Sequence, residues 1–506
     1  MARADRATQD PLTLEERRGK QIYLQGTSPS GEDIVATLGE AALAMPGNLM
    51  ACANCHGVYG RGKAEGNVRP SNLSWQSLST ATSTNRIHPG YNERSLEVAI
   101  TQGKDPAGNK LLNAMPRFQI SKADLDDLIA YLKRLDKDRD PGVSDSKLVI
   151  GAILPKGSMA TMGQTIKAVL AAYFDELNAA GGIYNRRVDL RFVEAGDSPA
   201  ATRAAVERFI KGEQIFALVG SFIAGTEKEI IPLMDQWEVP LVGPITLYPQ
   251  TAEPLNRYVF YLLSGLDEQA RVLVDFAAGQ AGPKKIVFGV VYPRTDLNLP
   301  IVGAIKAQCE KNSLDAPQTY EFVNGRFDAA GALNQVKRAG VTDVILLGND
   351  VDTLSFMREA EKLSWFPSIY GVASSGGSML SDAPLGFDGK TFIAFPTSPA
   401  DQTPDGMAEF RAFAQKHQLG SEHIAMQVST YSAAKLMLEG LRLAGKDVSR
   451  EQLVLTLEGL HGYKSGLTPV ISFGPDRRVG ALGAYVVGVD LKKKKYSSAS
   501  AWLEPK

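Results

Sequence analysis

The run Cys-Ala-Asn-Cys-His at residues 52–56 constrains this chain more than any other feature, because it lies in a segment that lacks a core of its own. About a hundred residues rich in Gly, Asn, Ser and Pro separate an expected helix at 14–25 from another at 121–135. Such a loop-rich stretch cannot bury enough apolar surface by itself. The sequence therefore predicts that something other than protein fills its centre.

The chemistry of the motif indicates what that filler is. Two thiols one helical turn apart can each add to a porphyrin vinyl group, and the neighbouring imidazole of His56 is then held against the iron. A redox dithiol, half of a zinc site and chance are the alternatives. Zinc requires a second Cys/His pair, and a redox site requires a strand before the motif and a helix after it, whereas a Gly-rich loop follows here. We predict one covalent haem c, with its iron, on Cys52, Cys55 and His56.

Cysteine count and charge exclude several classes of protein. The chain of 506 residues has three cysteines, so a disulfide framework is ruled out, and we expect Cys309 to be buried on a helix. Lys plus Arg number 55 and Asp plus Glu number 56. This balance favours neither nucleic acid nor an anionic membrane as partner. No apolar run approaches the ~18 residues that a membrane span needs.

The second half of the chain has a different pattern. A charge-rich run ending in Pro141-Gly142 predicts a linker at 137–146. After it, expected strands alternate with expected helices, which favours parallel sheets covered by helices on both faces. About 360 residues are too many for one such sheet, so we expect two α/β lobes. The strands are expected at 148–154, 188–193, 215–219, 286–291, 344–347 and 391–395, and the helices at 163–180, 200–211 and 227–237.

Residues 11–136 resemble the small single-haem c-type cytochromes. In that family a helix, the haem motif, a loop with a Met ligand and a last helix follow in this order. Met115, followed by Pro116, matches the Met-Pro ligand loop, and Pro70 matches the proline whose carbonyl accepts the imidazole N–H. The resemblance implies an all-α cytochrome c domain at 1–136 with His56 and Met115 as iron ligands. It also implies a close crossing of the terminal helices at Gly19.

Other side chains could reach the iron instead, namely Met45, Met50 and His88. Ligation by His and Met fills the iron's coordination sphere and favours electron transfer, so an enzyme is the weaker hypothesis, although a haem enzyme remains an alternative. Thioether attachment in this family follows export, which implies a periplasmic protein. The first residues contain no apolar signal segment, so we expect a signal peptide to have been removed. Residues 31–50 exceed what the minimal fold needs.

Residues 147–506 resemble the type I periplasmic solute-binding proteins, in the ABC-transporter branch that serves branched-chain amino acids. The first strand with its proline at 147–155, the Asn-x-x-Gly-Gly signature at 178–182 and the strand ends at 217–221 and 239–244 carry this resemblance. It implies two Rossmann-like lobes: lobe 1 at about 147–262 and 397–470, lobe 2 at about 263–396 and 471–506. It also implies an ABC transporter permease as a candidate partner.

The expected solute site departs from the amino-acid-binding pattern. The loop of lobe 2 at 370–375 contains no acid, so an ammonium group would lack its buried counter-charge. We therefore expect a small organic solute that is not a free α-amino acid, such as an aromatic or apolar acid or alcohol. The candidate solute contacts are Ser221, Thr246, Tyr248, Tyr292, Arg294 and Ser374.

Two functional hypotheses follow. In the first, the chain is a periplasmic solute receptor whose haem c exchanges electrons with a redox partner protein. In the alternative, it is the electron-transfer subunit of a periplasmic, quinoprotein-type dehydrogenase system, and the binding half serves docking or sensing.

Overall fold

The computed structural model describes residues 12–39, 42–62, 70–83, 86–251, 254–282, 285–373, 382–398 and 401–506. The chain divides into two compact units. The first unit comprises residues 1–145 and 444–452, and the second comprises residues 146–443 and 453–506. Among the described residues, no helix is both long and apolar enough to cross a membrane.

The first unit is mainly helical, as expected, but it also contains a small antiparallel sheet. That sheet has the strand order β2-β1-β3. The expected helix at 14–25 is α1, and the one at 121–135 is α5, capped by Ser121, whose hydroxyl accepts from the Asp124 amide at 3.2 Å. The elements are α1 (Leu14–Gln25), β1 (Val35–Leu38), β2 (Leu43–Pro46), η1 (Gly47–Met50), α2 (Cys52–His56), α3 (Trp75–Ser79), α4 (Glu93–Gln102), β3 (Arg117–Gln119) and α5 (Lys122–Leu132).

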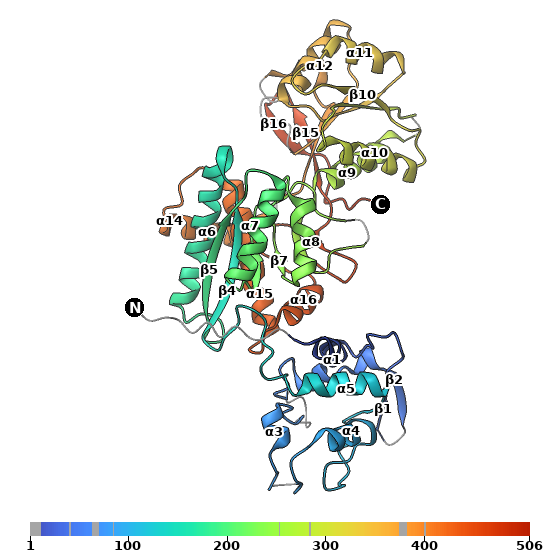
Figure 1. The fold of residues 1–506 in the computed structure, drawn as a ribbon. Helices are drawn as coiled ribbons and strands as arrows, with labels where there is room; N and C mark the ends of the chain where they lie inside the picture. Colours follow the sequence, from blue (N-terminus) through green and yellow to red (C-terminus); the bar gives the residue numbers. More distant parts are fainter. Residues whose placement is uncertain are drawn as a thin grey trace. The chain divides into compact units, whose positions relative to one another are not determined.

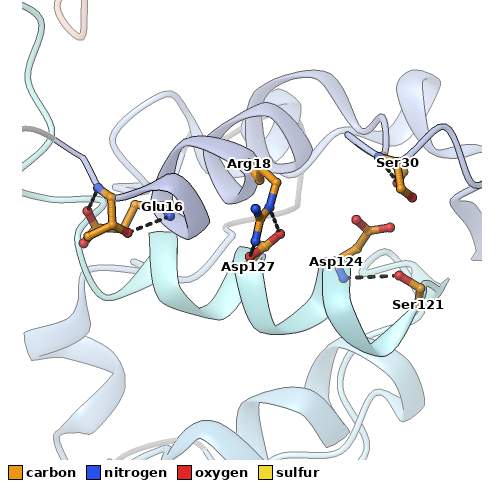
Figure 2. A network of polar contacts seen from close by, with 8 residues as sticks. Glu16, Arg18, Ser30, Ser121, Asp124 and Asp127 are labelled. Carbon is orange, nitrogen blue, oxygen red and sulfur yellow. Dashed lines mark hydrogen bonds and ion pairs between the residues drawn. The ribbon is translucent and has the colours of Figure 1, made fainter.

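Helices α1 and α5 cross at Gly19, which confirms the expected close approach. A Cβ atom at Gly19 would lie 2.0 Å from the Asp127 carbonyl oxygen, so only glycine fits here. Figure 2 shows Arg18 of α1 and Asp127 of α5 pointing toward one another, with nitrogen–oxygen distances of 2.5 and 2.9 Å. Close by, Tyr23 packs against Tyr131 with ring centroids 5.7 Å apart.

Residues 444–452 also belong to the first unit, although the sequence assigned them to lobe 1. The Tyr59 hydroxyl donates to the Val448 carbonyl at 2.8 Å, and the Asp140 carboxylate accepts from the Arg450 amide at 2.5 Å. These bonds join segments that are distant in sequence, so no local pattern could have revealed them.

The second unit contains two sheets, as expected for two α/β lobes. The sheet of lobe 1 is parallel, with strand order β14-β8-β7-β6-β4-β5. The sheet of lobe 2 has the order β10-β9-β11-β12-β13-β15-β16, and its last two pairings are antiparallel. The strands are β4 (Lys147–Leu154), β5 (Arg187–Glu194), β6 (Ala217–Val219), β7 (Leu241–Val242), β8 (Val259–Leu263), β9 (Phe288–Pro293), β10 (Gln318–Phe322), β11 (Asp343–Leu346), β12 (Ser368–Val372), β13 (Thr391–Phe395), β14 (Val479–Ala481), β15 (Tyr485–Asp490) and β16 (Lys495–Ser498).

Each lobe also contains helices or strands from the C-terminal part of the chain (Figure 1). The orange to red helices α14, α15 and α16 lie with the green helices of lobe 1, and the red strands β15 and β16 lie with the yellow elements of lobe 2. The helices are η2 (Gly157–Met159), α6 (Ala160–Ala179), α7 (Pro199–Gly212), α8 (Glu227–Trp237), α9 (Leu266–Ala281), α10 (Asn298–Lys311), α11 (Ala329–Arg338), α12 (Asp350–Lys362), η3 (Leu385–Phe387), α14 (Pro404–Lys416), α15 (Ile424–Ala444) and α16 (Arg450–Glu458).

One lobe boundary differs from the expectation. Residues 471–481 were placed in lobe 2, but β14 pairs in parallel with β8, Val479 opposite Tyr261, and so belongs to lobe 1. The chain changes sheet between β14 and β15 instead. A three-residue strand carries too little periodic signal to reveal its partner. Cys309 has no exposed surface and packs in the core of lobe 2, as expected.

Candidate functional site: a cofactor cavity and a solute site

A cavity of about 450 Å³ opens in the first unit around the cysteine motif. Its volume lies in the range of ~300–1,000 Å³ typical of small-molecule and cofactor sites. Cys52, Cys55, His56 and Met115 all line it. Most of the remaining wall is apolar, from residues such as Leu73, Leu78, Leu96, Ile100, Phe118 and Leu128. A large planar apolar cofactor held by the motif fits such a space.

The motif forms the short helix α2, which places both sulfurs and the imidazole on the cavity wall. Gly57, with φ of 77°, ends this helix in a conformation that other residues rarely adopt. The Tyr23 hydroxyl of α1 donates to the Gly57 carbonyl at 2.6 Å. The crossing of α1 and α5 thereby holds the end of the helix that presents His56.

One ring nitrogen of the buried His56 is already hydrogen-bonded within the protein. Its Nδ1 lies 2.9 Å from the Ser71 carbonyl oxygen, which can only accept, so Nδ1 carries the proton and the Nε2 lone pair is free. Burial lowers the pKa of His56, which favours the neutral imidazole that metals bind.

The prediction that the Pro70 carbonyl accepts this proton was wrong by one residue. The Pro70 carbonyl oxygen lies against Gly62, where a Cβ atom would come within 2.2 Å of it, while Ser71 supplies the acceptor. Pro70 itself lines the cavity. Which of two successive carbonyls turns toward a ring depends on backbone torsions, and residue identity does not encode them.

Met115 reaches the cavity from the loop between α4 and β3, a segment remote in sequence from α2. The Arg117 guanidinium donates to the Met115 carbonyl and to the Leu111 carbonyl, the latter at 3.0 Å. Among the alternative ligands, Met50 and His88 also line the cavity, whereas Met45 does not. The His88 Nδ1 is already 2.8 Å from the Pro89 carbonyl oxygen.

The two other uses of the cysteine pair are poorly supported. A redox-active cysteine needs a lowered pKa, but burial raises the pKa of Cys52 to about 12. Within the described ranges, no group of three or more His, Cys, Asp or Glu side chains is placed to hold a metal ion. The Cys52 thiol is therefore not poised as a thiolate.

The candidate solute residues divide into separate groups. Ser221 has no exposed surface, and its Oγ accepts from the Ile153 amide at 3.1 Å. A completely buried side chain cannot contact a solute, so the prediction for Ser221 was wrong. Its hydroxyl instead links the ends of β4 and β6. Ser374 lies outside the described residues.

Thr246 and Tyr248 form a connected pair with an acid that the sequence reasoning missed. The Thr246 hydroxyl donates to Glu227 at 2.6 Å and accepts from the Tyr248 amide at 3.0 Å. The Tyr248 hydroxyl donates to the Leu297 carbonyl. Glu227 begins α8 shortly after the expected ligand loop, and that position was the available signal.

Tyr292 and Arg294 both interact with Glu321 on β10, one of the two edge strands of the lobe 2 sheet. Tyr292 is 6% exposed, belongs to the core, and has its hydroxyl 3.4 Å from the Glu321 carboxylate. Arg294 is exposed and pairs with the same carboxylate at 3.1 Å. The predicted anion clamp by Arg294 therefore already has an internal counter-ion, and Tyr292 is a packing residue.

Comparisons with known proteins agree with this division. The sequence model of the periplasmic binding protein family matches residues 147–495, and that of cytochrome c matches residues 39–136. The cofactor of the first unit is accordingly haem c, covalently bound and containing iron.

Curated relatives match the second unit. A Leu/Ile/Val-binding protein, BraC3, of Rhizobium johnstonii is 22% identical over 62% of this chain and 84% of its own length. A Leu/Ile/Val-binding protein homolog of Brucella melitensis is 25% identical over 40% of this chain, which spans only 54% of that relative. An amino acid binding protein of Pseudomonas aeruginosa is 22% identical over 53% of this chain and 71% of its own length.

Solved structures show the same fold. A branched-chain amino acid ABC transporter protein of Thermus thermophilus with bound valine superposes with a TM-score of 0.57 at 17% identity, covering 71% of this chain and 97% of its own. A fatty acid ABC transporter substrate-binding protein of Thermomonospora curvata gives 0.55 at 18% identity, covering 72% and 95%. The chain therefore belongs to the periplasmic binding protein family and carries a cytochrome c domain ahead of the binding fold.

Proposed function

We propose that this protein is a periplasmic solute receptor whose haem c transfers electrons to or from a partner protein. Cys52 and Cys55 hold the haem through thioethers, and His56 and Met115 are the two iron ligands. When bound, the haem supplies a one-electron redox couple. The protein holds the neutral imidazole in one orientation and surrounds the cofactor with a mostly apolar wall.

The observation that carries this proposal is the arrangement at His56. A proton on Nδ1, fixed by the Ser71 carbonyl, leaves Nε2 as the metal-binding atom inside a cavity that the two cysteines also line. A carbonyl partner of this kind raises the basicity of a metal-bound histidine. Met115 supplies a soft, neutral ligand, and such ligation favours electron transfer over oxygen chemistry.

For the second unit we propose a small organic solute other than a free α-amino acid. Glu227, the acid next to the candidate contacts of lobe 1, already accepts from Thr246. The described end of β12 in lobe 2, up to residue 373, contains no acid. An ammonium group would thus find no free carboxylate on these two segments, which disfavours its burial against them. The Leu/Ile/Val-binding relatives favour branched-chain amino acids instead, and calorimetry distinguishes the two solute classes.

The haem assignment is tested by spectroscopy of the full-length holoprotein. We expect a Met–iron charge-transfer band in the oxidised protein that disappears in Met115→Ala, while covalent haem is retained. Met45→Ala, on a strand outside the cavity, is the control and should keep the band. A high-spin iron in the unaltered protein would contradict the proposal.

The solute assignment is tested by calorimetry of the same holoprotein. Benzoate and benzyl alcohol represent aromatic acids and alcohols, and leucine, isoleucine and valine represent the amino acids. We expect binding from the first group only. Binding of an amino acid would overturn the proposed solute class, and no binding by any of the five would favour the use of this unit for docking.

A further inference from the structure

We propose that Arg117 is the positioning residue for Met115, and that the hairpin β1–β2 braces Arg117 against the haem-attachment segment. This inference rests on the proposed function, in which Met115 is an iron ligand. It gives residues 31–50, which exceed the needs of a minimal cytochrome fold, a role: they tie together the two segments that carry the iron ligands.

The Arg117 side chain bridges two carbonyls of the Met115 loop, the segment between α4 and β3. Its guanidinium donates to the Met115 carbonyl and, at 3.0 Å, to the Leu111 carbonyl. A guanidinium is charged at any relevant pH, and hydrogen bonds from a charged donor are stronger than those between neutral groups. The loop is therefore held by a side chain that does not itself line the cavity.

The C-terminal end of α4 leaves room for the Arg117 guanidinium because residue 103 is glycine. Gly103 ends the helix with φ of 68°, and a Cβ atom there would lie 1.6 Å from the Arg117 Nε. The Leu111 amide also donates to the Gly103 carbonyl at 2.8 Å. Glycine at 103 thus meets two needs, a left-handed conformation and the space that the guanidinium occupies.

The hairpin fixes the backbone of Arg117. In the sheet, Thr37 of β1 pairs with Arg117 of β3, and the completely buried Ala36 pairs with Phe118, which lines the cavity. The Gly39 amide donates to the Asn113 carbonyl, inside the Met115 loop, at 3.3 Å. Strand β1 and Gly39, which follows it, therefore bind the chain on both sides of Met115.

The other strand of the hairpin leads to the motif. Strand β2 pairs with β1 and runs directly into η1 and then α2. The Gly47 amide at this junction donates to the Ile34 carbonyl at 2.7 Å, and a Cβ atom at Gly47 would lie 2.5 Å from the Gly26 carbonyl oxygen. The start of the haem-attachment segment is thus locked to the strand that holds the Met115 loop.

The physical consequence concerns competition for the iron. A thioether is a weak ligand, so it stays bound only if its loop loses little entropy on binding. Without Arg117 the loop gains freedom and an external ligand can displace Met115 more easily. Loss of one charge-assisted hydrogen bond is enough for a rise of about tenfold in the affinity for such a ligand.

The test uses the full-length holoprotein with imidazole as the external ligand of the oxidised iron. We expect Arg117→Ala to keep covalent haem, weaken the Met–iron band, lower the reduction potential and bind imidazole about tenfold or more tightly. Arg117→Lys, which keeps the charge, should fall between Ala and the unaltered protein. Arg94→Ala, an exposed arginine on α4, is the matched control and should change neither readout.

An unchanged band and imidazole affinity in Arg117→Ala would overturn the inference. If that variant yields no holoprotein, Gly103→Ala decides, because the added methyl group displaces the guanidinium without removing it, and an unaltered imidazole affinity there would also overturn the inference. Absence of the Met–iron band from the unaltered protein contradicts the proposed ligand itself, so the two failures are distinguishable.

Discussion

The haem site of the first unit and the solute site of the second are built in different ways. In the first unit, three of the four residues proposed to hold the haem lie within five positions, on one short helix. In the second, the candidate residues lie on or after separate strands, and several already bind protein partners. Ser221 bonds to Ile153, Thr246 to Glu227 and Arg294 to Glu321. A covalently held cofactor requires particular residues at particular spacing, whereas a solute site requires only a suitable surface. The fold of the second unit therefore does not specify which solute it binds.

The largest expected effect comes from removing the haem, which should destabilise the first unit and leave the second unit unaffected. We expect Cys52→Ala/Cys55→Ala to contain no covalent haem and to lose cooperative unfolding of the first unit, because its core surrounds the cavity. The second unit has its own cores and should still unfold cooperatively. Haem staining of denaturing gels and scanning calorimetry measure both effects. Cys309→Ala should retain haem, and covalent haem in the double variant would contradict the assignment.

Two glycines test how tightly each unit is packed. A Cβ atom at Gly19 meets the Asp127 carbonyl at 2.0 Å, so Gly19→Ala should destabilise the first unit by about 2 to 3 kcal/mol. Gly303, within α10, has no atom within 4 Å of its Cβ position, and Gly303→Ala should stabilise the second unit by about 0.5 to 1 kcal/mol. Urea unfolding of each variant measures both. Equal effects of the two substitutions would mean that the helix crossing tolerates a methyl group.

A smaller effect is expected at the ion pair that spans the same crossing. Asp127→Asn removes the carboxylate that Arg18 contacts through two nitrogens, and we expect the first unit to unfold a few degrees lower. Asp126, one position away, is exposed and pairs along α5 with Lys122. Asp126→Asn should leave the unfolding midpoint unchanged within error. Differential scanning calorimetry compares the two variants.

The smallest effect concerns pH and the second unit. Hydrogen bonds from Lys416 and His417 lower the pKa of Glu176. A carboxyl whose pKa is lower in the folded state adds stability above its unfolded pKa and loses it as the pH falls through the folded value. Because this side chain is partly exposed, the contribution should be well below 1 kcal/mol. Glu176→Gln should abolish that part of the acid dependence in urea titrations. A loss of more than about 1 kcal/mol of unfolding free energy would contradict the expectation that solvent screens this carboxylate.

The local sequence pattern was sufficient to predict many of the helices and strands. The helix at 14–25 and the strand at 391–395 have the predicted bounds, and the helix at 227–237 begins and ends as expected. These elements are long, periodic or strongly apolar, so their signal is contained in neighbouring residues. Strand β14 and the small sheet β2-β1-β3 were not predicted, because these strands have only three or four residues each and β14 and β3 pair with strands that are remote in sequence.

By itself, the sequence determined the cofactor and the two-part organisation and predicted the attachment residues, because each depends on contiguous residues or on regular periodicity. Tertiary structure alone decided which carbonyl holds His56, that Arg117 seats on Gly103, and that Ser221 is unavailable to a solute. These outcomes depend on backbone direction and on burial by distant segments. Such properties arise only when the chain has packed, because the neighbours that create them are far apart along it.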